Sequence, residues 1–184
     1  MQNKSKITFI KNKRAKRISI TFLPFEDIKV TIPPNIPRKT AHLFINQNHK
    51  RINQILRLRT LQEQIALSVT EKKISKKEAK IKLSKEIYDL SKQYGFKFNN
   101  LTFRTQKSRW GSCSSKNNLS INLKIIFLPE NLKKFIIIHE LAHLIHKNHS
   151  RKFWNLVAKY MPGYKIYRRE LQKYSGILRL TPFK

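Results

Sequence analysis

The sequence contains little cysteine, glycine or acid, and the shortage of cysteine is the most informative. Its 184 residues include one cysteine, Cys113, along with four glycines and ten acidic side chains. A single cysteine excludes an intramolecular disulfide, and it excludes a zinc site that uses a pair of cysteines from one chain. The fold therefore cannot be stabilised by either of these two cross-links.

Long apolar runs are also missing. Residues 1–12 alternate charged and single apolar side chains, without the continuous apolar segment of a secretory signal. No later segment is typical of a membrane span. We therefore expect a cytoplasmic protein with no membrane partner. The length and the 40% apolar content suit one compact domain, or a catalytic domain with a small N-terminal addition.

Acidic residues are far too few to balance the basic ones. Forty Lys and Arg side chains against ten Asp and Glu give a formal net charge of +30. Such a charge attracts nucleic acid and other anionic partners without specifying a fold or a chemistry. The chain is also rich in Lys, Ile and Asn, a bias typical of an AT-rich genome. Composition thus leaves two interpretations open: non-specific nucleic-acid binding through basic patches, and genome bias.

The first part of the chain has the pattern of short strands. Residues 7–10, 18–22 and 28–32 are β-prone runs separated by a basic stretch and by a turn segment containing proline. Three prolines follow the last run and end it. We expect residues 1–38 to form an N-terminal β meander.

Residues 39–95 have the pattern of helices. Apolar side chains recur at helical spacing from about residue 40, with a possible interruption. Two capping-box patterns follow, Thr60 with Glu63 and Ser75 with Glu78, and Gly95 is suited to end the second helix. We therefore expect 39–95 to be a helical segment.

The remaining residues, 96–184, are expected to form the catalytic core. Two strands, 101–104 and 119–123, flank a turn-rich segment, and Pro129 is placed to open a further helix. That helix is predicted to dock on a sheet through an apolar face that includes Phe135, Ile138, Ala142 and Ile145.

The same helix carries the sequence His139-Glu140-Leu141-Ala142-His143. Four of the six histidines in the chain fall between positions 139 and 149, where Glu140 is the sole acidic residue. Residues four apart lie on one helix face, so both imidazoles of the motif can bind one metal ion. Glu140 is then beside the metal and can act as a general base. An ordinary amphipathic helix with two satisfied histidines is the alternative interpretation.

The third ligand has two main candidates. His149 follows His143 by six residues, beyond an Asn148 that can end the helix and turn the chain back toward the site. Glu170, on a later helix, is the rival. We favour His149 on local spacing, and we expect His146 to overshoot the metal and to act as an outer or surface histidine.

Several motifs in this order resemble one known family. They are Arg109-Trp110-Gly111-Ser112-Cys113-Ser114, the strand that follows, His139-Glu140-Leu141-Ala142-His143, Asn148-His149-Ser150 and Phe153-Trp154. From about Phe98 to Leu171 the chain resembles the YgjP-like predicted metal-dependent hydrolases, which are related to SprT-like and minimal gluzincin-type zincins.

This resemblance implies an α+β fold with a minimal zincin-like catalytic domain, in which a small sheet packs on the active-site helix. It also implies Zn²⁺ held by His139, His143 and His149, with Glu140 as the catalytic base. The expected function is a zinc-dependent metallopeptidase that hydrolyses peptide bonds of a peptide or protein substrate by Glu-assisted attack of zinc-bound water.

The neighbouring motif residues have less certain roles. We expect Trp110 to pack against the helix and Cys113 to be a buried, inert thiol. Arg109 is a candidate for polarising a substrate carbonyl.

A second function, from a different class, also fits the charge. The chain could be a nucleic-acid-binding protein whose basic runs 11–17 and 72–85 contact phosphates around a structural zinc site, or a protease acting on DNA-bound protein. A closed site with four ligands would favour the structural role, and an open position would favour catalysis.

Overall fold

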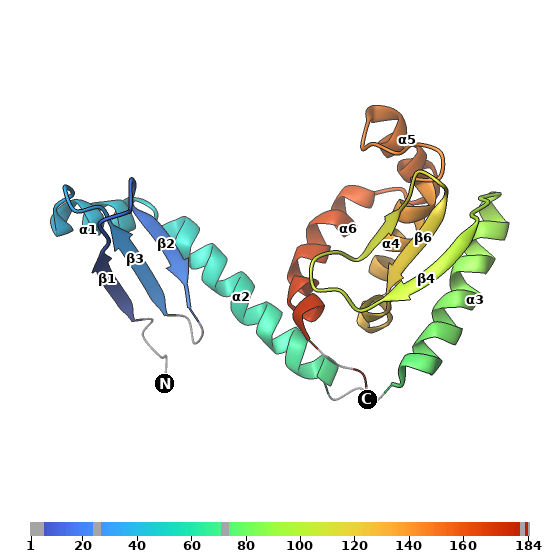
Figure 1. Ribbon diagram of the computed structural model, residues 1–184, viewed down its shortest axis with the longest axis horizontal. Helices are drawn as coiled ribbons and strands as arrows, with labels where there is room; N and C mark the ends of the chain where they lie inside the picture. The colour runs from blue at the N-terminus through green and yellow to red at the C-terminus, as the bar shows by residue number, and fades with distance from the viewer. Residues whose placement is uncertain (1–5, 24–26, 71–73, 181–182, 184) are drawn as a thin grey trace. The chain divides into compact units, whose positions relative to one another are not determined.

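The computed structural model describes residues 6–23, 27–70, 74–180 and 183. Lys72 and Lys73, part of the second basic run, lie outside these residues. The chain divides into two compact units, Met1–Leu61 and Gln62–Lys184, each of which is described by itself (Figure 1). The boundary falls within one helix. The three expected segments, 1–38, 39–95 and 96–184, therefore stay a prediction.

The N-terminal unit is a three-stranded sheet with helices, but it is not a meander. Its strands are β1 (Ile7–Lys11), β2 (Ser19–Phe22) and β3 (Ile28–Ile32), in the order β1-β3-β2. β3 is parallel to β1 and antiparallel to β2. The meander was wrong because β3 has the strongest apolar alternation: Ile28, Val30 and Ile32 are all buried. Such a strand is most stable in the centre, with a partner on each edge.

Two helices complete this unit. They are α1 (Arg38–Gln47) and the first part of α2 (His49–Thr70), interrupted at Asn48 as the sequence predicted. Ala41, Ile45, Ile52 and Leu56 from these helices share a core with the buried residues of β3. The helices thus bury one face of a sheet that could not be stable alone.

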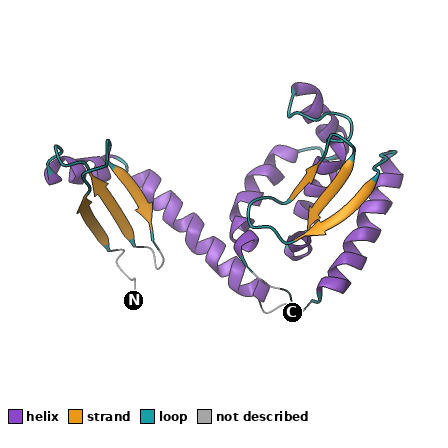
Figure 2. Cartoon of the chain, viewed as in Figure 1, coloured by secondary structure: helices purple, strands orange, loops and turns teal. Residues whose placement is uncertain are grey.

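The second unit contains the candidate site. Its sheet has the order β4-β6-β5, with β4 parallel and β5 antiparallel to the central β6. β5 falls in the segment that the sequence suggested was only turn, because a three-residue strand is too short to give a period-two pattern. The elements of this unit, after the end of α2, are α3 (Lys76–Tyr94), β4 (Asn100–Arg104), β5 (Gly111–Cys113), β6 (Asn118–Asn122), η1 (Leu123–Phe127), α4 (Glu130–Ala142), α5 (Arg151–Tyr160), α6 (Tyr164–Glu170) and η2 (Leu171–Arg179) (Figure 2).

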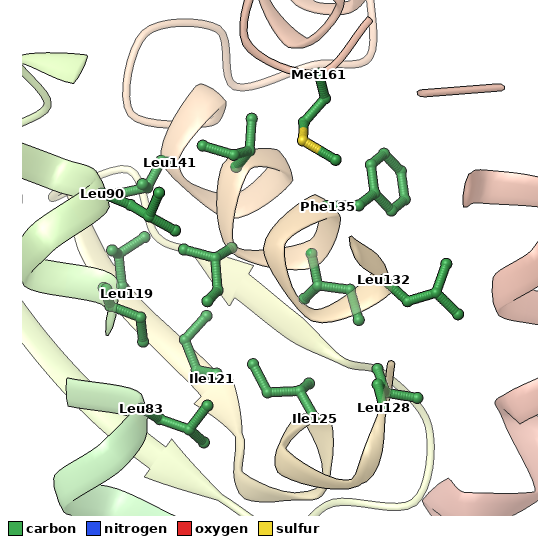
Figure 3. Packing of buried hydrophobic residues seen from close by; sticks show 14 of the residues in the cluster. Leu83, Leu90, Leu119, Ile121, Ile125, Leu128, Leu132, Phe135, Leu141 and Met161 are labelled. Carbon is green, nitrogen blue, oxygen red and sulfur yellow. The ribbon is translucent and has the colours of Figure 1, made fainter. Parts of the chain in front are cut away.

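Helix α4 lies at the centre of this unit. It packs against β5, β6, α5 and α6, and most of its side chains are buried. Figure 3 shows Leu132, Phe135 and Leu141 of this helix in one buried cluster with Leu119 and Ile121 of β6. The mixture of small sheets and six helices confirms the predicted α+β class, with a small sheet packed on the active-site helix.

An ion pair joins α4 to α3. The Lys133 ammonium lies 2.9 Å from a carboxylate oxygen of Glu86 and 2.8 Å from one of Glu130. Burial is the main reason that the pKa of Glu86 is raised, and Lys133 opposes that effect. The pair therefore fixes which face of α3 meets α4.

The helix boundaries differ at two places from those predicted from the sequence. Thr60 caps nothing, because it lies inside α2, where its hydroxyl donates to the carbonyl of Leu56 at 3.2 Å. Helix α4 ends at Ala142 with His143 as its C-cap, earlier than predicted. Ile145 consequently leaves the apolar face and is 56% exposed. Among the described helices, none is long and apolar enough to cross a membrane.

The other capping box is present and gives a stability test. Ser75 accepts a hydrogen bond from the Glu78 amide at 3.2 Å, and the Glu78 side chain accepts one from the Ser75 amide at 2.9 Å. We expect Ser75→Ala to lower the free energy of unfolding by about 1 kcal/mol. Ser68→Ala is the control in the same unit, because the exposed Ser68 hydroxyl donates to the carbonyl of Ile65 inside α2, and it should change the free energy of unfolding by less than about 0.5 kcal/mol. Urea unfolding followed by tryptophan fluorescence reports this unit, since both tryptophans, Trp110 and Trp154, belong to it. Equal effects of the two substitutions would contradict the capping assignment.

Candidate metal centre

Three imidazoles converge at the C-terminal end of α4. His139 lies in its last turn, His143 is its C-cap, and His149 lies in the loop before α5. Each offers a ring nitrogen, and these three atoms all lie within 4.8 Å of one another. The rival Glu170 is absent from this group and instead lies 3.5 Å from the Lys173 ammonium.

The spacing of the ring nitrogens suits a divalent metal. Nε2 of His139 and Nε2 of His149 are 3.1 Å apart. Two nitrogens that bind one tetrahedral zinc ion at about 2.0–2.1 Å lie roughly 3.3 Å from each other. The observed separation is close to this value, so the residues present fit a bound ion.

His143 is oriented by the backbone of the loop. Its Nδ1 lies 3.0 Å from the carbonyl oxygen of His146. A carbonyl can only accept, so Nδ1 carries the proton and Nε2 keeps the lone pair that a metal needs. His146 thus serves the site through its backbone, and its ring is outside the ligand group among the described residues.

Aromatic packing orients the other two rings. Phe153 is fully buried, and its ring centroid lies 5.0 Å from that of His139 and 4.4 Å from that of His143. Trp154 is stacked on His149 with centroids 5.5 Å apart and an interplanar angle of 22°. Both aromatic residues open α5, whose N-cap is the expected Ser150, and the Phe153 amide donates to its hydroxyl at 3.4 Å.

A lysine fastens the loop that carries His149. The Lys147 ammonium donates to the side-chain oxygen of Asn117 at 2.6 Å and to the carbonyl of Ser114 at 2.9 Å. Both acceptors belong to the turn between β5 and β6. No local sequence pattern marks this contact, because Lys147 and Asn117 are thirty residues apart.

Burial keeps the imidazoles of His139 and His143 neutral. Burial first, and then the positive charges that His143 and His149 can carry, lower the pKa of His139 to about 3. Burial also lowers the pKa of His143. Neutral imidazoles are the form that binds a metal, so these two ligands need release no proton near neutral pH.

Glu140 follows His139 on α4, and its side chain lies against Gly111 of strand β5. It is 6% exposed, and burial raises the pKa of its carboxyl to about 8, although Arg109 opposes the shift. Its Oε2 is buried and has no hydrogen-bond partner among the described residues. A buried polar atom of this kind is costly unless a water or another bound molecule satisfies it.

Gly111 is required for that arrangement. A Cβ at this position would lie 2.6 Å from Cγ and 2.7 Å from Oε1 of Glu140. The sequence showed this glycine as part of a motif, but its role became visible only when β5 was placed against α4.

The remaining motif residues have simpler positions. Trp110 is half-buried against the core, as expected. Cys113 is half-buried rather than buried, and burial raises the pKa of its thiol, so the thiol is protonated at neutral pH. Arg109 is exposed, and its carbonyl accepts from the Asn122 side-chain amide at 2.9 Å.

Comparison with known families identifies the family to which the chain belongs. The YgjP-like metallopeptidase domain matches residues 60–174, more than half of the chain. The chain belongs to the YgjP-like metallopeptidase family. It is therefore a metal-dependent hydrolase that acts on peptides or proteins, and the resemblance noted in the sequence is confirmed.

Comparison with individual known proteins gives a partial structural similarity. Among solved structures, the chain is similar to the metallopeptidase zymogen of Pyrococcus abyssi abylysin, with 24% sequence identity and a TM-score of 0.43. The similarity covers 48% of this chain and 90% of that one. No curated protein matches the sequence.

Replacing Gly111 should disturb Glu140 without removing the metal ligands. We expect Gly111→Ala to lower peptide hydrolysis by at least about tenfold, because misplacing a reacting group by a fraction of an ångström is costly. Metal content, measured by elemental analysis, should stay at the wild-type value. Ser112→Ala, the next position along β5, is the matched control. Wild-type activity in Gly111→Ala would show that the close approach has no role.

The buried carboxyl also predicts a pH dependence of stability. In the metal-free chain the folded state holds the Glu140 proton up to a pKa of about 8, whereas the ordinary value is 4.5. The resulting stabilisation is complete below pH 4.5 and is lost as the pH rises through 8. Relative to Glu140→Gln, we expect the free energy of unfolding of wild type to fall by about 2–4 kcal/mol across this range. Urea unfolding with a chelator present measures it, and parallel pH profiles would contradict the assignment.

Proposed function

We propose that the chain is a zinc-dependent peptidase in which His139, His143 and His149 hold the metal and Glu140 is the catalytic base. The observation that carries the proposal is the convergence of three imidazoles beside one buried carboxyl with an oxygen that has no partner among the described residues. Three histidines with one further open position are typical of catalytic rather than structural zinc.

Zinc, when bound at these imidazoles, supplies a Lewis acid that polarises a carbonyl and acidifies a water. Its charge also favours the ionised form of Glu140, which offsets the effect of burial on that carboxyl. Glu140 then accepts a proton from water at its unpartnered oxygen. The water oxygen bonds to the carbonyl carbon of the substrate, and Glu140 returns the proton to the departing amide nitrogen as the C–N bond breaks.

Strand β5 is suited to hold the peptide. It lies at the edge of its sheet, where β6 is its sole partner strand among the described residues, and its Gly111 contacts Glu140. An extended peptide can add to such an edge through backbone hydrogen bonds. This placement brings a substrate carbonyl toward the carboxyl and the imidazoles.

The structural-zinc alternative is less well supported. It requires a fourth protein ligand, and within the described part of the chain the group contains only three residues. Nucleic-acid binding by the basic runs stays a prediction. The charge of +30 motivates it, and salt-sensitive DNA binding by the 11–17 stretch would test it separately from the metal site.

Metal content and turnover, measured on the same variants, test the proposal. We expect about one zinc per wild-type chain by elemental analysis of protein purified without a metal-affinity tag. His149→Ala should lose the metal, whereas Glu170→Ala, the matched control, should keep both metal and activity. Glu140→Gln should keep zinc and lose peptide hydrolysis by about a thousandfold or more. Retained hydrolysis in Glu140→Gln would remove the base assignment, and a metal-free wild type supplied with zinc would remove the site.

A further inference from the structure

The surroundings of the metal centre are strongly positive. Between Glu130 and Glu170, Glu140 is the sole acidic residue in the sequence. Arg109 acts electrostatically on Glu140, and Arg168 acts on His139. The ammonium of Lys147 is also held next to this site. A bound divalent cation would add further positive charge, and Glu140 is the one carboxyl group of this stretch that can offset it.

Arg168 is a cation that an aromatic side chain holds beside the ligands. Its guanidinium carbon lies 4.9 Å from the Trp154 ring centroid. That indole is stacked on His149 and also lies 5.7 Å from His139. Tyr164 stacks on the same indole at 5.0 Å with an interplanar angle of 10°. Trp154 thus fixes one planar cation against two of the metal ligands.

This guanidinium is available for an outside partner. Arg168 is exposed, and among the described residues no carboxylate lies within ion-pair distance of it. The nearest acidic residue in sequence, Glu170, is paired with Lys173. A fixed arginine with free donors matches a carboxylate in a bidentate geometry.

We propose that Arg168 forms an anion-binding subsite of the metal centre, which selects peptides carrying a carboxylate, from an acidic side chain or a free C-terminus, next to the scissile bond. The inference rests on the proposed function, because it names the substrate class of that same site. Arg168 would bind the carboxylate and Trp154 would keep the guanidinium in place. The excess positive charge of the centre favours the same substrates at longer range.

The test uses ligands that bind without being cleaved. Two peptide hydroxamates, identical except for Asp or Asn next to the metal-binding group, are titrated into zinc-loaded protein by calorimetry. We expect wild type to bind the Asp compound about tenfold more tightly at low salt. Arg168→Gln should reduce this preference to about twofold or less, and Arg168→Lys should retain part of it. Arg169→Gln, an exposed arginine at the next position, should leave it unchanged.

A second pair of ligands separates the two sources of the carboxylate. Hydroxamates with a free or an amidated C-terminus repeat the titration, and a preference lost in Arg168→Gln for one pair alone identifies which carboxylate the subsite takes. An undiminished preference in Arg168→Gln, or none in zinc-loaded wild type with either pair, would overturn the proposal. These results leave the catalytic assignment untouched, since that depends on zinc content and on the loss of turnover in Glu140→Gln.

For any cleavable peptide pair, the substitution should raise KM for the acidic member and leave kcat nearly unchanged. That pattern is expected for a group that holds substrate and transition state equally. A structural role for Arg168 would instead alter both peptides alike.

Discussion

The burial of α4 between its sheet and α5 is the constraint on which the centre depends. This packing removes water from His139 and Glu140 together, which keeps the imidazole neutral and the carboxyl protonated in the metal-free chain. The neutral imidazole favours a divalent cation because it needs no deprotonation, and a bound cation would in turn favour the ionised form of the carboxyl. The helix at the centre of the core is therefore also the helix that carries Glu140, the proposed base.

The sequence predicted the parts of the centre that lie close together in the chain. Helical periodicity, the Ser150 cap and the spacing from His139 to His149 are local properties, and each was recognisable without a structure. Other contacts of the centre join separate segments of the chain. They are the contact of Gly111 with Glu140, the hydrogen bond from Lys147 to Asn117 and the stacking of Arg168 on Trp154. No periodicity or cap encodes such contacts, so they became visible only in three dimensions.

The errors in the fold have a similar origin. Strand propensity located β1, β2 and β3 but did not give their order, since a meander and the observed arrangement use the same residues. The two sheets share one topology, in which the third strand in sequence lies between the other two. In both, the central strand is also the most buried. In each sheet the central strand has a partner strand on both edges and buries its apolar side chains on one face. This requirement, rather than a repeated sequence, accounts for the shared topology.

The ligands and the base differ in how much of the chain must be ordered before they can act. All three imidazoles come from one short, contiguous stretch, so bringing them together closes only a small loop, with a small loss of chain entropy. Placing Glu140 requires β5, which is separated from it by β6, η1 and most of α4. The proposed ligands therefore depend on the order of one short segment, whereas the position of the proposed base depends on a strand from a distant part of the chain.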